Sequence, residues 1–101
     1  MLHIVNKSPL ERNALESCIK HAVKGSAVLL IEDGVYGAMQ GTSKASMVET
    51  AMKEDISFYV MGADLKARGI DEARVIDGMT VTDYNGFVDL VAEYDKTQSW
   101  L

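Results

Sequence analysis

The chain has 101 residues, of which 48% are hydrophobic and 25% charged, proportions that exclude a disordered chain or a disulfide-knot scaffold. This length predicts one domain, residues 1–101, with a core that folds without a metal or a cross-link. Ten Lys and Arg against 15 Asp and Glu give a formal net charge of −5, which argues against direct binding of nucleic acid.

The cellular compartment is indicated by the cysteine content and by the N-terminus. Cys18 is the one cysteine, so an internal disulfide is impossible and a reducing compartment is favoured. The N-terminus has no basic flank followed by an apolar segment and a cleavage site, and the longest clean apolar run is 27–31. That run is far shorter than a membrane-spanning helix. We therefore expect a cytoplasmic protein with no membrane partner.

The first elements are a short apolar run at 2–5 and a helix. Residues 8–11, Ser-Pro-Leu-Glu, have the pattern of a capping box, and proline at the first helical position loses no hydrogen bond. We predict a helix from Pro9 that ends at Gly25, because glycine readily adopts the left-handed conformation of a helix terminator. Apolar residues recur along it at steps of three and four: Leu15, Cys18, Ile19, Ala22 and Val23.

The central strand is predicted at 27–31, which is apolar on both faces and is closed by Glu32-Asp33-Gly34. The glycine-rich stretch that follows predicts a loop or a short irregular helix. Residues 46–49, Ser-Met-Val-Glu, repeat the capping-box pattern and predict a helix whose apolar side holds Val48, Ala51 and Met52. Residues 56–61 are aromatic and branched, as in a strand.

The C-terminal part predicts five more elements. Residues 64–68 fit one or two helical turns that Gly69 ends, and 74–76 and 79–82 are brief extended segments. Asp83 predicts the N-cap of a helix, and residues 98–101 predict a terminal strand. The apolar face of that helix consists of Tyr84, Phe87, Val88, Val91 and Tyr94.

The alternation of strands and helices predicts the α/β class. We expect a small open, mainly parallel sheet of four to five strands, with helices on both faces and right-handed crossovers. The order of the strands cannot be read from this pattern. The six methionines, the aromatic helix face around Phe87 and the apolar ending Trp100-Leu101 exceed the needs of one core of this size, so we also expect a partner surface.

Few residues suggest a cofactor. His3 and His21 are the two histidines and lack the spacing of metal ligands, and no phosphate-binding glycine loop is present, so we expect no metal, nucleotide or other cofactor. Glu32 and Asp33 stand where open α/β sheets bind ligands, although Asp33 before a glycine is more simply explained as turn chemistry. The basic residues, Lys66, Arg68 and Arg74, are interpreted mainly as a solvated face, with an acidic partner as the alternative.

Cys18 is the candidate for covalent chemistry, because a thiolate attacks sulfur and accepts a persulfide sulfur. Its position on the apolar stripe equally fits a small buried core residue. His21, one helical step away, would stabilise a thiolate if it were protonated and facing Cys18. A sulfur carrier should lie at the rim of the stripe, where the thiol reaches solvent, and not at its centre.

Five segments along the whole chain form a recognisable set: Asn6-Lys7-Ser8-Pro9, Leu29 to Gly34, Asp64-Leu65-Lys66-Ala67-Arg68-Gly69, Asp83-Tyr84-Asn85-Gly86-Phe87-Val88 and Trp100-Leu101. In this order they resemble the DsrH/TusB family, with DsrH the nearer branch because of Cys18. The resemblance implies a subunit of a cytoplasmic heterohexamer and not a standalone enzyme. Its partners would be DsrE/TusD-like and DsrF/TusC-like chains, and its sulfur acceptor a DsrC/TusE-like carrier.

The resemblance also leaves two functions open. In the DsrH branch, the complex passes persulfide sulfur during sulfur oxidation, and Cys18 would be the candidate persulfide carrier. In the TusB branch, the subunit is chiefly structural and the relay serves 2-thiolation of the tRNA wobble uridine. We expect the first, with the second as the alternative.

Overall fold

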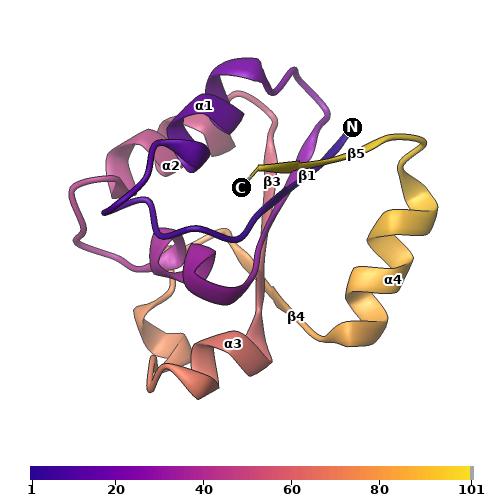
Figure 1. Ribbon diagram of the computed structural model, residues 1–101. Helices are drawn as coiled ribbons and strands as arrows, with labels where there is room; N and C mark the ends of the chain where they lie inside the picture. Colours follow the sequence, from indigo (N-terminus) through magenta and orange to yellow (C-terminus); the bar gives the residue numbers. More distant parts are fainter. Residues whose placement is uncertain (101) are drawn as a thin grey trace.

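Five parallel strands form one sheet at the centre of the molecule (Figure 1). The computed structural model describes residues 1–100. The strand order is β4-β3-β2-β1-β5, and every neighbouring pair is parallel. The strands are β1 (Leu2–Val5), β2 (Ala27–Leu30), β3 (Ser57–Met61), β4 (Thr80–Thr82) and β5 (Thr97–Trp100). The first and last strands therefore lie side by side.

The helices are divided unequally between the two faces of the sheet. Figure 1 shows α1, α2 and α3 on one side and α4 alone on the other. The α/β class, the parallel sheet and the helices on both faces are thus confirmed. The helical segments are α1 (Ala14–His21), η1 (Glu32–Ala38), α2 (Ala45–Lys53), α3 (Gly62–Ala67), η2 (Glu72–Arg74) and α4 (Tyr84–Glu93), with η1 and η2 in the 3-10 conformation.

Alternation along the strands sends side chains into two separate cores. On β2, Val28 and Leu30 belong to the large core beneath α1 and α2, whereas Ala27 and Leu29 belong to the small core beneath α4. All four are fully buried, as expected for the central strand of a parallel sheet. Among residues 1–100, the small core contains four buried residues, the other two being Leu2 and Leu90.

The first helix is shorter at both ends than the sequence predicts. In a capping box the Ser8 side chain would bond the Glu11 N–H, but here the Ser8 carbonyl accepts that N–H, at 3.2 Å, and the Arg12 N–H, at 2.9 Å. Residues 8–12 therefore form a turn, and the predicted start at Pro9 is wrong. The helix ends at His21 and Ala22 is extended, so Val23 is 67% exposed and does not belong to the apolar stripe.

The second predicted capping box is also absent, because α2 already begins at Ala45, before Ser46. The apolar side of α2 is confirmed, with Val48 and Ala51 buried. Arg74 lies in η2 and is not extended, while Val75 forms an isolated antiparallel bridge with Met39.

The C-terminal elements follow the sequence more closely. The Asp83 carboxylate accepts the Gly86 N–H at 2.9 Å, which confirms it as the N-cap of α4. The terminal strand is confirmed over 97–100, and Leu101 lies outside the described residues. The predicted apolar face of α4 is only partly correct, because Phe87 and Tyr94 pack on the small core while Tyr84, Val88 and Val91 are exposed.

Candidate functional site

Cys18 lies in the middle of α1 and faces the large core. Its side chain is 0% exposed, and the thiol is free. Leu15, one turn earlier, is equally buried, whereas Ile19 and Ala22 are only partly buried at the margin of the cluster. Cys18 is therefore at the centre of the stripe in this chain, and not at the rim, where a sulfur carrier is expected to lie.

Burial sets the protonation of this thiol. Desolvation raises the pKa of Cys18 from 9.0 to about 12, because a thiolate would lose its hydration in the apolar core. At neutral pH the side chain is therefore a neutral thiol. Nucleophilic attack on sulfur requires the thiolate, so a carrier role needs the core around α1 to open.

His21, which was expected to assist Cys18, and the neighbouring Lys20 are both engaged elsewhere. His21 Nδ1 donates to the Ser17 carbonyl at 2.8 Å, and its ring packs against Trp100 at a centroid distance of 5.5 Å. Lys20 forms an exposed ion pair with Glu16 at 3.7 Å. Neither arrangement directs a positive charge at the thiol.

Two histidines and a tryptophan form a cluster that the sequence analysis missed. Trp100 Nε1 donates a hydrogen bond to His3 Nδ1 at 3.1 Å, and the His21 ring packs against Trp100 on its α1 side. The indole N–H is only a donor, so His3 Nδ1 must be unprotonated and the imidazole neutral. Burial, then the N-terminal amine, then His21 lower the pKa of His3, in agreement with this arrangement. This contact could not be predicted from the sequence, because residues 3 and 100 meet only through the pairing of β1 with β5, and the strand order could not be read from the sequence.

The carboxyl ends of the central strands hold an ion-pair network. Arg68 in the turn after α3 contacts Asp33 of η1 at 2.9 Å and Asp64 of α3 at 3.8 Å. Asp64 also accepts the Glu32 N–H at 2.9 Å, where Glu32 has a positive φ of 50°. The network holds η1 against α3, so Asp33 and Arg68 have a structural explanation. Lys66 and Arg74 are exposed and lie outside it.

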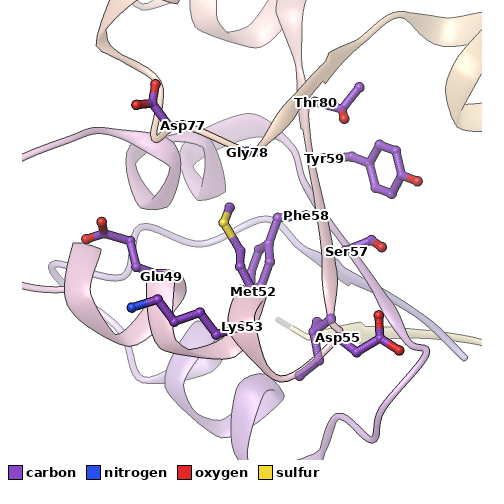
Figure 2. Close-up of a pocket in the computed structure, with 11 residues that line it drawn as sticks. Glu49, Met52, Lys53, Asp55, Ser57, Phe58, Tyr59, Asp77, Gly78 and Thr80 are labelled. Atoms are coloured by element: carbon purple, nitrogen blue, oxygen red, sulfur yellow. The ribbon is translucent and has the colours of Figure 1, made fainter.

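A cavity of about 480 Å³ opens between α2, β3 and the start of β4 (Figure 2). Figure 2 shows Met52 and Phe58 at its centre and the charged groups of Glu49, Lys53 and Asp77 at its margin. No cysteine or histidine lines it. The cavity therefore brings together none of the candidate residues from the sequence.

Among residues 1–100, no three His, Cys, Asp or Glu side chains gather in a way that could hold a metal ion. No helix in this part of the chain combines the length and the apolarity needed to cross a membrane.

The fold is shared with solved structures of low sequence identity. The ychN protein from E. coli superimposes with a TM-score of 0.81 at 16% identity, covering 97% of each chain. The protein MTH1491 from Methanobacterium thermoautotrophicum gives a TM-score of 0.76 at 17% identity, covering 97% of this chain and 95% of that one. These similarities define the class of structure, a small parallel α/β domain.

Sequence comparison assigns the family within that class. The family described as "DsrH like protein" matches residues 7–97. Protein TusB of Erwinia tasmaniensis is 33% identical and Protein TusB of Pectobacterium parmentieri 29% identical, each over 99% of this chain and 100% of the relative. The chain belongs to the DsrH/TusB family of sulfur-relay subunits.

Proposed function

We propose that this chain is the TusB-like, chiefly structural subunit of a cytoplasmic complex that relays sulfur for 2-thiolation of the tRNA wobble uridine. The observation that carries this proposal is the full-length similarity to TusB proteins, which reaches 33% identity with 99% of this chain and 100% of the relative covered. The branch that we expected first, DsrH in sulfur oxidation, is less well supported, because the relatives described above carry the TusB name.

The burial of Cys18 supports a structural role in the relay. A thiol that is 0% exposed and has a pKa near 12 contributes packing to the large core and almost no thiolate at neutral pH. In this proposal the sulfur is carried on cysteines of the TusD-like and TusE-like proteins. The present chain completes the assembly with TusC-like and TusD-like chains.

A gene deletion in the source organism tests the pathway. Loss of this chain should abolish 2-thiouridine at the tRNA wobble position, measured by mass spectrometry of digested tRNA, and the wild-type gene should restore it. Unchanged 2-thiouridine together with impaired oxidation of reduced sulfur would reject the TusB reading in favour of the DsrH reading.

The persulfide-carrier role of Cys18 is the second candidate, favoured by its position on the first helix. The Cys18→Ala variant separates the two roles within the reconstituted complex. We expect it to transfer sulfur to the TusE-like acceptor at the wild-type rate. A loss of transfer with an intact complex, or an added sulfur of about 32 Da on native Cys18, would instead establish the carrier role.

A further inference from the structure

The helix α4 is apolar on two sides, and only one of them is covered. Phe87, Leu90 and the following Tyr94 pack on the small core. A second set of apolar side chains, here called the α4 stripe, follows at steps of four and three and is exposed: Tyr84 at 70%, Val88 at 48% and Val91 at 42%. These spacings place the three on one side of the helix. A helix that is apolar on both sides is expected to be buried on both.

The α4 stripe concentrates the exposed apolar surface of residues 1–100. Six large hydrophobic side chains are exposed there, and half of them belong to the stripe, the others being Met1, Leu10 and Val23. Such clustering on one element marks an interaction site, whereas isolated exposed apolar residues do not.

The stripe continues into an apolar groove. Tyr84 lines a cavity of about 610 Å³ together with Met61, Ala63 and Val81, at the carboxyl ends of β3 and β4. Specific protein interfaces bury roughly 800 Å² on each partner, more than three side chains provide. An occupant of the stripe is therefore expected to extend over this groove.

The sheet on the same side is also incompletely covered. Parallel sheets normally have helices over both faces, yet α4 is the one helix on this side (Figure 1). Tyr59 packs on the small core beneath α4, and Ser57 and Thr80, which share its side of the sheet, are exposed. The uncovered part of this sheet face is thus continuous with the groove and the α4 stripe.

Charge distinguishes a second copy of this chain from a different partner. All four charged residues between positions 83 and 95 are acidic: Asp83, Asp89, Glu93 and Asp95. Two copies that met through their stripes would bring these carboxylates together, and each copy carries a net charge of −5. A partner with Lys and Arg around an apolar patch would pair with them instead.

We propose that the α4 stripe and its adjoining groove form the docking surface for a different chain that presents an apolar patch rimmed by Lys and Arg. This inference rests on the proposed function, because the relay subunits supply the partner chains. It goes beyond that function by naming the surface and the chemistry that complements it.

The experiment measures complex formation with purified TusC-like and TusD-like chains of the same organism. The V88S/V91S variant removes the apolar contacts and should weaken binding at least tenfold. The matched control is V23S, which makes the same change at a valine that is more exposed, at 67%, in the loop after α1. Circular dichroism and thermal unfolding check that each variant folds, as expected for changes at exposed positions.

A charge-reversal variant, D89K/E93K, tests the partner's chemistry. It should weaken the mixed complex at low salt and leave this chain monomeric in analytical ultracentrifugation. If it instead strengthens self-association of this chain, the occupant is a second copy and the inference is overturned. If V88S/V91S binds its partners as tightly as the wild-type chain does, the inferred docking surface is wrong and the proposed function is unaffected. Failure of the wild-type chain to join either partner overturns the inference and the proposed function together.

Discussion

The properties of Cys18 follow from its surroundings more than from its chemistry. The same residue type on the same helix would be reactive at an exposed position, because thiolate formation depends on solvation and nearby charge. Here the apolar core raises its pKa to about 12. The sequence located Cys18 on the apolar stripe, but it could not tell the centre of the stripe from its rim, because that depends on how α1 is rotated against the sheet.

A raised thiol pKa predicts how stability responds to alkaline pH. The folded chain keeps the Cys18 proton up to about pH 12, whereas the unfolded chain releases it near pH 9.0. The unfolded state therefore binds fewer protons between these values, and the free energy of unfolding falls as the pH rises above 9.0. Urea denaturation at pH 8 and pH 10 should show this decrease.

The Cys18→Ala variant is the control, and it should show a smaller decrease. It should also lower the free energy of unfolding at pH 8 by roughly 1–2 kcal/mol through lost packing. An identical pH response in the two proteins would contradict the assignment to Cys18.

The buried His3 predicts the opposite response at acid pH. The pKa of His3 is lowered by burial, by the N-terminal amine and by His21. Below about pH 6.5 the unfolded state therefore binds more protons than the folded state, and the free energy of unfolding falls as the pH is lowered. Protonation also removes the acceptor of the Trp100 hydrogen bond. Trp100 is the one tryptophan of the chain, so its fluorescence reports this step directly.

The variant His3→Leu tests this assignment. It should flatten the acid dependence of both Trp100 fluorescence and the unfolding free energy, whereas His21→Asn should retain most of that dependence. If His21→Asn alone removes the dependence, the titrating group is His21 and the interpretation of the hydrogen bond changes.

Among the helices, α4 is the one whose start the sequence specified correctly, because its signal is a single local hydrogen bond. Asp83→Ala removes the acceptor of the Gly86 N–H and should destabilise the protein by about 1 kcal/mol. Asp95→Ala, a nearby exposed carboxylate that follows the helix, should change stability much less. Equal unfolding midpoints for the two variants would show that the cap contributes little.

The other helix starts show why a local pattern is not sufficient. Both Ser-x-x-Glu patterns satisfy the capping-box spacing, yet neither starts a helix, because the first lies in a turn and the second lies inside α2, which begins at Ala45. Glu11 is an example: its N–H bonds the Ser8 carbonyl inside a turn. Strand identity was predicted well from apolar runs, while strand order, and with it the His3–Trp100 contact, depends on pairing between distant parts of the chain.

Across the whole molecule, the terminal strand holds the N-terminal strand in place. β5 pairs with β1 from Leu2–Thr97 to Val5–Trp100, and the Trp100 side chain closes over His3. A chain that ends at residue 96 should therefore lose cooperative thermal unfolding. The Thr97→Ala/Ser99→Ala variant keeps the backbone pairing and changes only exposed side chains, so its melting temperature should stay close to that of the full chain.

The pairing of β1 with β5 also has a consequence for synthesis on the ribosome. Of the five strands, β1 is translated before the others and its neighbour β5 after them, roughly 5–20 s later at ordinary elongation rates. During this interval one edge of β1 has no native partner, and unpaired strand edges are templates for association with other chains. The sheet is completed only when β5 has also left the ribosome and these distant parts of the chain can meet. Newly made copies are therefore most prone to aggregate in the interval before that final pairing.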